Sequence, residues 1–217
     1  MNGAPGSLAE PRSDCPLCPR LVAFRAESAR ANPGWFNGAV PSFGDREGRL
    51  LVVGLAPGLK GANRTGRPFT GDVAGELLYG TLAAHGFARG TYAARPDDGF
   101  TLTDAMITNA VRCVPPANKP TPEEAATCRR FLSARLAALP RLRVILALGR
   151  IAHESVLRAL DMPVREAPFA HGARHELGRR VLYDSYHCSR YNTQTGRLTP
   201  AMFDAVFTAI RAELDAA

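Results

Sequence analysis

Four short apolar runs, separated by segments of helix length, most constrain how this chain can fold. Continuously apolar runs of this length are typical of strands in a parallel sheet, because both faces of such strands are covered. Strands that alternate with helices predict a three-layer α/β/α sandwich around a mainly parallel sheet of about four strands. The predicted strands are Leu50–Gly54, Ala105–Val111, Val144–Leu148 and Val181–Ser185.

The segments between these strands carry signals that start helices. Thr121 is suited to cap a helix, Pro122 to its first turn and Glu124 to a capping box, and Thr199–Pro200 repeats the start of this pattern. A length of 217 residues fits one domain, residues 15–217, after a flexible tail, residues 1–14. Helices are predicted over Leu17–Ala31, Val73–His85, from Thr121 onward, Gly149–Leu160 and Thr199–Leu214, and a surface loop over Arg89–Phe100.

Three unusual loops follow predicted strands. Ligands of open parallel sheets bind beyond the carboxyl ends of the strands, and those ends share one edge of the sheet. The loops are Leu55–Asp72 after the first strand, Arg112–Asn118 after the second and His187–Arg197 after the fourth. We therefore expect the functional site where these three loops meet.

Five cysteines in a chain without a secretory signal indicate reduced thiols rather than a disulfide framework. Cys15 and Cys18 form a closely spaced pair. Cys128 lies on the helix that Thr121 starts, with fourteen residues between it and Cys113. Four thiolates suit either zinc or an iron–sulfur cluster, and the spacing does not choose between them. Cys188 stands apart in the loop after the fourth strand and is predicted to be unligated.

The formal net charge of +7 favours a polyanionic partner. All but two of the 27 basic residues are arginines, however, which also fits a coding bias toward arginine, so charge alone leaves nucleic-acid binding open. No apolar run approaches the roughly 20 residues of a membrane-spanning helix. The N-terminal residues 1–14 lack the basic and apolar regions of a secretory signal.

Four side chains in these loops are suited to chemistry on a nucleobase, and three of them have a plain structural alternative. The Phe69 ring either stacks on a base or packs into the core beneath its loop. Asp72 is either a catalytic carboxylate or the N-cap of a helix. Asn109 carries an amide that reads a base edge. His187 stabilises charge on a base oxygen or is a structural histidine, whereas the other histidines, His85, His153, His171 and His175, show no partner pattern.

Four motifs in order, together with the cysteines, closely resemble the type-b uracil-DNA glycosylases, the fifth family of the uracil-DNA glycosylase superfamily. The motifs are Gly-Leu-Ala-Pro-Gly from Gly54, Thr-Gly-Arg-Pro-Phe-Thr-Gly-Asp from Thr65, Thr-Asn-Ala-Val-Arg-Cys-Val-Pro-Pro from Thr108, and Ser-Tyr-His-x-Ser-Arg-x-Asn-Thr-Gln-Thr-Gly-Arg-Leu-Thr from Ser185. The resemblance implies an enzyme that flips a damaged base out of DNA and cleaves its N-glycosidic bond.

Roles for individual residues follow from this resemblance. It implies a [4Fe–4S] cluster on Cys15, Cys18, Cys113 and Cys128, catalytic roles for Asp72 and His187, and a DNA-wedging loop over Ser189–Leu198. It also implies a cytoplasmic, nucleoid-associated monomer of bacterial or archaeal type that acts on DNA containing uracil. The base pocket is expected at Ala56, Gly58, Phe69 and Asn109, and DNA contacts at Arg64, Ser189, Arg190, Asn192 and Arg197.

Two positions depart from the wider superfamily. Leu55 and Ala56 stand where related enzymes carry an acid or amide that activates water, so Asp72 is the expected substitute. Gly58 stands where strictly uracil-specific enzymes have a tyrosine, which predicts room for hypoxanthine and xanthine beside uracil. The alternatives are a metal-stabilised nucleic-acid-binding protein without catalysis, a small redox protein, and a relative that stays covalently attached to its product.

Overall fold

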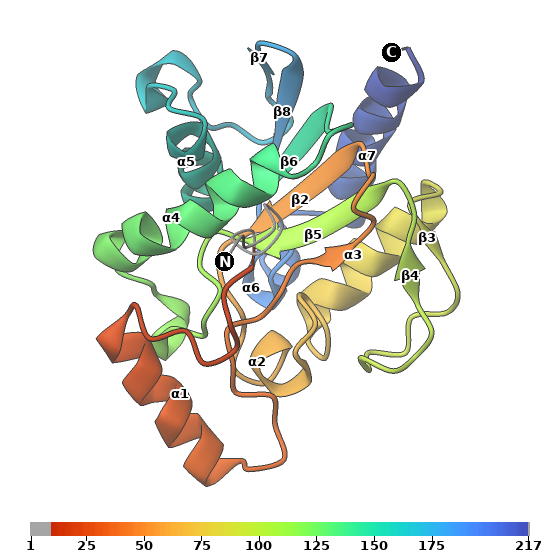
Figure 1. Ribbon diagram of the computed structural model, residues 1–217. Helices are drawn as coiled ribbons and strands as arrows, with labels where there is room; N and C mark the ends of the chain where they lie inside the picture. The colour runs from red at the N-terminus through yellow and green to blue at the C-terminus, as the bar shows by residue number, and fades with distance from the viewer. Residues whose placement is uncertain (1–9, 217) are drawn as a thin grey trace.

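The computed structural model describes residues 10–216, and its central layer is a six-stranded sheet (Figure 1). The four predicted strands form the parallel centre of this sheet, which confirms the predicted fold class. Two short antiparallel strands at the edges were not predicted. In order across the sheet, the strands are β1 (Phe43–Gly44), β5 (Ala105–Asn109), β2 (Leu50–Gly54), β6 (Val144–Leu148), β8 (Arg180–Ser185) and β7 (Arg174–Leu177).

Side chains of the parallel strands alternate between two separate cores. Leu50 and Val52 of β2 point into a core with α3 (Val73–Ala84) and α7 (Pro200–Asp215). Leu51 and Val53 of the same strand point the other way, toward α4 (Pro122–Ala137) and α5 (Arg150–Ala159). Burial on both faces explains why these strands are apolar at every position, and it makes the sheet the middle of three layers (Figure 1).

Helix ends follow the predicted chemistry closely. The Thr121 hydroxyl accepts a hydrogen bond from the Glu124 backbone N–H at 3.2 Å, and a Glu124 carboxylate oxygen accepts one from the Thr121 N–H at 2.8 Å. These two bonds form the predicted capping box of α4. The first helix, α1 (Pro19–Ala31), begins two residues later than predicted because Cys18 is extended and forms its N-cap.

Four short helices and a small hairpin complete the regular structure among the described residues outside the core layers. The loop predicted over residues 187–197 contains a helical turn, α6, whose N-cap is Ser189. The loop predicted over residues 89–100 begins and ends at a two-stranded sheet, and Phe100 within it is buried. The remaining elements are α2 (Ala62–Thr65), β3 (Ala88–Arg89), β4 (Thr101–Leu102), η1 (Pro116–Asn118), η2 (Val164–Glu166) and α6 (Arg190–Gln194).

The N-terminal tail predicted over residues 1–14 falls mostly outside the described residues. Where the description starts, the Glu10 carboxylate pairs with the guanidinium groups of Arg112 and Arg135. The backbone N–H of Ala39 donates to the Ser13 carbonyl at 2.8 Å, so residues 10–14 pack against the domain. Within the described residues, no helix combines the length and apolar character needed to cross a membrane.

Candidate active site

A pocket of about 570 Å³ opens where β2, β5 and β8 end, and the three predicted loops meet there. The parallel pairing brings the ends of β2 and β5 together, since Gly54 lies opposite Asn109. Ser185, the last residue of β8, is followed by the segment that carries His187. Of the predicted site residues, Ala56, Gly58, Phe69, Asp72, Asn109, His187, Ser189 and Arg190 line this pocket.

Asn109 presents an amide oxygen that lacks a hydrogen-bond partner within the described residues, although it is buried. The amide lies over Gly54, where an added Cβ would come within 2.4 Å of Asn109 Oδ1 and 2.6 Å of Phe69 Cζ. A glycine is therefore required at the end of β2. Leaving a buried polar atom unpaired costs about 1–3 kcal/mol, which a ligand N–H that reaches this oxygen would recover.

Phe69 lines the pocket from a strained backbone conformation. Its φ of 52° is left-handed, and its ring lies 5.7 Å from the His187 ring at an interplanar angle of 26°. Its carbonyl oxygen would lie 1.8 Å from a Cβ at position 75, so only glycine fits there. The side chain is 7% exposed, so it both packs in the core and offers a face to the pocket.

A buried ion pair holds the Phe69 loop in this conformation. The Arg67 guanidinium makes two hydrogen bonds of 2.8 Å to the Asp98 carboxylate and packs over the rings of Phe43, Tyr79 and Tyr92. Tyr92 also donates from its hydroxyl to the Phe69 carbonyl at 3.2 Å. The segment predicted as a surface loop, residues 89–100, is therefore a brace for the pocket.

Asp72 caps α3 and also faces the pocket. One carboxylate oxygen, Oδ1, accepts a hydrogen bond from the Gly75 N–H at 3.2 Å. The other, Oδ2, would lie 3.2 Å from a Cβ at Gly58, on the pocket wall. Burial raises the pKa of Asp72 above its ordinary value, and its helix-capping bonds oppose this rise. The Asp72 side chain thus both caps α3 and lines the pocket.

His187 is a neutral imidazole at neutral pH. Burial lowers the pKa of the ring to about 4, and the ring stacks against Phe69 beside the pocket. The Asn192 side-chain N–H donates to the His187 carbonyl at 2.8 Å. That bond ties the helical turn α6 to the segment that presents the ring, so Asn192 points inward rather than toward solvent.

A second cavity of about 340 Å³ adjoins the pocket at His187. Asn192 and Arg197 line this cavity rather than the first one, together with Arg150 and Tyr186. Arg197 packs over the Tyr186 ring at 4.6 Å. Arg64 lines neither cavity; its side chain is exposed and donates to the Gly71 carbonyl at 3.4 Å. The predicted DNA-contacting residues therefore surround the pocket without forming one cluster.

Four cysteines from three segments gather in a small core of their own. Cys113 and Cys128 are each 7% exposed and pack with Leu21 and Phe131, and Cys15 and Cys18 close the cluster. Burial raises the pKa of the Cys113 and Cys128 thiols to about 11 and about 12. Cys188 lies elsewhere, fully buried in the core beside α3 and α7.

The surroundings of these thiols suit a metal centre. The Arg112 backbone N–H donates to Cys128 Sγ at 3.3 Å, a contact of the kind that tunes iron–sulfur clusters. Four thiols in one cluster are a donor set for an iron–sulfur cluster or for a zinc ion.

Comparison with known proteins identifies the family. The uracil DNA glycosylase superfamily matches residues 41–211. A type-5 uracil-DNA glycosylase of Thermus thermophilus is 50% identical over 196 residues, which cover 87% of this chain and 89% of the relative. The chain belongs to the type-5 uracil-DNA glycosylases.

Other proteins are similar to this chain over smaller or less identical regions. A type-5 enzyme of Mycobacterium tuberculosis is 41% identical over 219 residues, covering 95% of this chain and 82% of that one. A type-4 enzyme of Archaeoglobus fulgidus is 34% identical over 141 residues, or 64% and 63% of the two chains. A crystal structure of Pedobacter heparinus SMUG2 covers 79% of this chain and 77% of that one, with a TM-score of 0.49 and 15% identity.

Several residues beside the pocket of this type-5 glycosylase were not singled out from sequence. Tyr191 lines the pocket and is 71% exposed, and the only signal for it is an aromatic residue in a polar, basic loop. Asn118 lines the same pocket from the loop after β5. Arg67 and Asp98 lie 31 positions apart, and no local pattern connects them.

We expect Asp98→Asn to destabilise the protein by about 3 kcal/mol, because Arg67 would stay buried without its counter-charge. The Arg67 hydrogen bonds lower the pKa of Asp98, so this stabilisation is complete above the ordinary Asp pKa and is lost only as pH falls toward the lowered value. Urea unfolding followed by circular dichroism measures the change.

The matched control is Asp97→Asn, since Asp97 is exposed and pairs loosely with Arg95 at 3.6 Å. Its effect should stay within about 0.5 kcal/mol. Equal free energies of unfolding for the two variants would contradict the role of the Arg67–Asp98 pair in holding the Phe69 loop.

Proposed function

We propose that this protein is a monofunctional DNA repair glycosylase. It flips a deaminated base out of DNA and hydrolyses the N-glycosidic bond, leaving an abasic site. The observation that carries the proposal is the unpaired, buried Asn109 amide oxygen at the back of the pocket, beside the Phe69 and His187 rings. An N–H on the edge of uracil or hypoxanthine satisfies this oxygen. Membership of the type-5 family supports the same reaction.

The neutral His187 ring supplies electrostatic stabilisation in this proposal. As the glycosidic bond stretches, negative charge develops on the leaving base, and a preorganised donor stabilises it by about 3 kcal/mol. A neutral imidazole carries one N–H for this purpose. Phe69 stacks on the extruded base, which contributes roughly 1–3 kcal/mol toward the cost of unstacking it from the duplex.

Asp72 is the proposed carboxylate that orients water and offsets positive charge on the sugar. Leu55 and Ala56 on the same wall carry no group for this task. Oδ2 of Asp72 faces Gly58 on the pocket wall, whereas Oδ1 accepts the helix-capping bond from Gly75. The raised pKa of Asp72 strengthens the carboxylate as a base.

Gly58 determines the proposed base range. A Cβ built at this position would meet only Asp72 Oδ2, at 3.2 Å, within 4 Å of it. The absence of a side chain there leaves the pocket open on the side where a larger ring would extend. We propose that hypoxanthine and xanthine are released as well as uracil.

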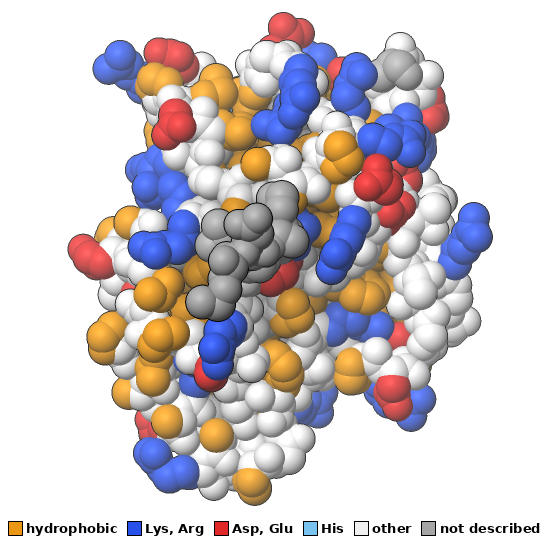
Figure 2. All heavy atoms as spheres, viewed as in Figure 1, with side chains coloured by type: hydrophobic (Ala, Val, Ile, Leu, Met, Phe, Trp, Pro, Cys, Tyr) orange, Lys and Arg blue, Asp and Glu red, His pale blue; other side chains and the backbone are white. Residues whose placement is uncertain are grey.

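The DNA duplex is proposed to contact the pocket rim. Arg64, Arg190 and Arg197 are exposed around it, and Ser189 and Tyr191 stand on the helical turn at its edge. On the face drawn in Figure 2, basic side chains are spread among acidic ones rather than gathered in a stripe. We propose local phosphate contacts by a monomer that is cytoplasmic and associated with the nucleoid.

Cys15, Cys18, Cys113 and Cys128 are proposed to hold a [4Fe–4S] cluster. When bound, the cluster supplies a rigid link between α1, α4 and the segment after β5. Because the buried thiols have raised pKa values without metal, cluster binding releases protons and contributes directly to folding. Cys113 lies four residues beyond Asn109, so this link steadies the base-reading amide.

We expect the purified protein to release free base from duplexes that contain uracil, hypoxanthine or xanthine, measured by chromatography of the released bases. Gly58→Tyr should reduce hypoxanthine release relative to uracil because the added ring fills the open side of the pocket.

Four other outcomes of this assay are informative. Absence of hypoxanthine release would show that the base range is wrong, and equal release by Gly58→Tyr would exclude Gly58 as its cause. DNA binding without any base release would show a non-catalytic protein. An SDS-stable adduct with uracil DNA would show a covalent relative.

Asp72→Asn and His187→Ala should each lower single-turnover uracil release by about 100-fold or more. Wild-type activity should fall as pH drops through the raised pKa of Asp72, because protonation removes the carboxylate. Asp72→Asn should lose that dependence, because an amide does not titrate in this range.

Glu76→Gln is the control, since Glu76 is an exposed carboxylate in the first turn of the same helix. Near-normal cleavage by Asp72→Asn would exclude Asp72 as the water-orienting group.

Cys113→Ser should abolish the iron content and the broad visible absorption of the protein and lower its thermal midpoint, because one of four ligands is lost. Cys188→Ala should leave the iron unchanged, since Cys188 packs elsewhere in the core. Elemental analysis for iron and zinc measures both variants. Zinc in place of iron in the wild-type protein would contradict the cluster.

A further inference from the structure

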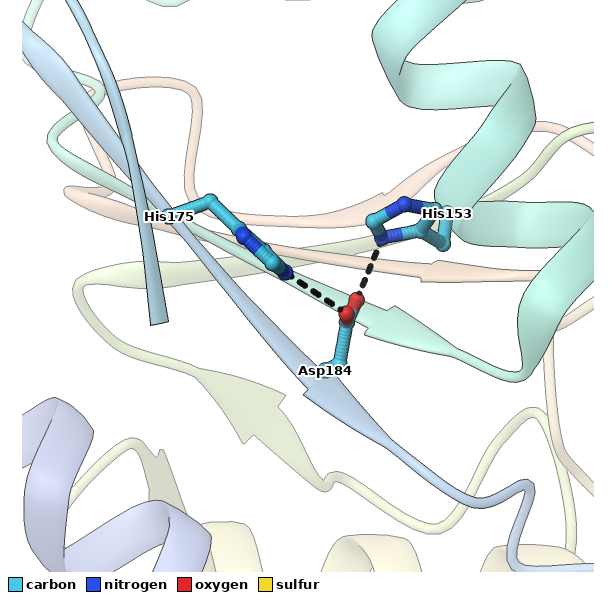
Figure 3. Close-up of side chains that lie close together, drawn as sticks. All are labelled: His153, His175 and Asp184. Carbon is cyan, nitrogen blue, oxygen red and sulfur yellow. Dashed lines mark hydrogen bonds and ion pairs between the residues drawn. The ribbon is translucent and has the colours of Figure 1, made fainter. Parts of the chain in front are cut away.

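A second group of metal-binding side chains is buried at the opposite edge of the sheet from β1. His153 of α5 and His175 of β7 point at the Asp184 carboxylate of β8 from two sides (Figure 3). Their ligand atoms all lie within 4.8 Å of one another. His153 and Asp184 have no exposed side-chain surface, and 13% of the His175 side chain is exposed.

The hydrogen bonds of His153 leave a place for a cation. Its Nε2 lies 2.8 Å from the Ala167 carbonyl, which only accepts, so this nitrogen carries the hydrogen. In the neutral ring Nδ1 then bears a lone pair, yet it lies 2.7 Å from Asp184 Oδ1, another acceptor. Two acceptors at this distance do not face each other unless a proton or a metal ion bridges them.

The arrangement matches the outer shell of known metal sites. A histidine that ligates a metal typically donates its other ring N–H to a backbone carbonyl or carboxylate, which fixes the tautomer. Ala167 provides that carbonyl for His153. His175 Nε2 lies 3.0 Å from the second carboxylate oxygen, Oδ2, so the three side chains face one point. Two imidazoles and one carboxylate are a donor set for zinc and similar divalent ions.

We propose that His153, His175 and Asp184 bind a divalent transition-metal ion of the zinc type. The ion replaces the proton between His153 and Asp184, and solvent that reaches past the exposed edge of His175 completes its coordination. Asp184 lies on β8, and His187 follows it by three residues, just beyond the end of that strand. The site is therefore a structural centre that anchors the segment leading to the pocket, and it uses none of the four clustered cysteines.

Cobalt titration of the chelator-treated protein with its cysteine centre loaded tests this proposal. Co²⁺ is a visible probe of zinc sites, and nitrogen and oxygen ligands give its visible bands without the charge-transfer bands of thiolate ligands. The wild-type protein should bind one equivalent in this way. Zinc should raise its thermal midpoint, which is a readout that needs no variant.

His175→Ala and Asp184→Asn should weaken cobalt binding by more than the roughly 10- to 100-fold that loss of an outer-shell partner costs. His175 is the safer variant because it lies partly at the surface. His85→Ala is the control: His85 pairs with Asp204 at 2.8 Å, away from this cluster, and should leave the titration unchanged. Failure of the wild-type protein to bind Co²⁺, or equal binding by the three variants, would overturn the proposal and leave a proton between His153 and Asp184.

Discussion

Parallel pairing of the four central strands is the constraint on which the rest of the molecule depends. In a parallel sheet the carboxyl ends of neighbouring strands share an edge, and here β2, β5 and β8 deliver Gly54, Asn109 and Ser185 to that edge. Side chains separated by more than a hundred residues in sequence consequently line one pocket. The apolar strands also fill both cores, so the edge is positioned by most of the hydrophobic burial in the domain.

Around this edge the backbone is irregular, and irregular backbone needs support. Phe69 adopts a left-handed conformation that costs free energy unless neighbouring groups enforce it. The buried Arg67–Asp98 pair and the Tyr92 hydroxyl hold that loop. Beyond Asn109, the segment after β5 contributes Cys113 to the cysteine cluster, and β8 contributes Asp184 to the cluster with His153 and His175. Each loop of the pocket thus has its own buried anchor.

Electrostatics in the pocket favour a neutral ligand that becomes anionic. Burial keeps His187 uncharged, and the buried Asn109 amide oxygen accepts no hydrogen bond from the described residues. Asp72 is the only acidic side chain on the pocket wall among the described residues, beside the exposed basic residue Arg190 at the rim. A nucleobase that leaves as an anion from a sugar that turns positive fits this distribution of charge, as the proposed reaction requires.

Local patterns were sufficient for the central strands and the capped helices, because those signals lie within a few residues of one another. The same patterns singled out Asn109, Asp72 and His187, which line the pocket. The two edge strands were missed, since β1 has two residues and β7 is polar, and neither shows a strand period. The brace by Asp98 and the inward turn of Asn192 depend on contacts that only folding creates.

The cluster of His153, His175 and Asp184 shows most clearly which features depend on the tertiary structure. His153, His175 and Asp184 have no spacing that sequence reasoning recognises, because α5, β7 and β8 each contribute a single residue. The positions of the central strands along the chain and the chemistry of the loops follow from the pattern of apolar and turn-forming residues. Which distant side chains share a buried site is decided by strand order and helix packing, because only these determine distances between segments far apart in sequence.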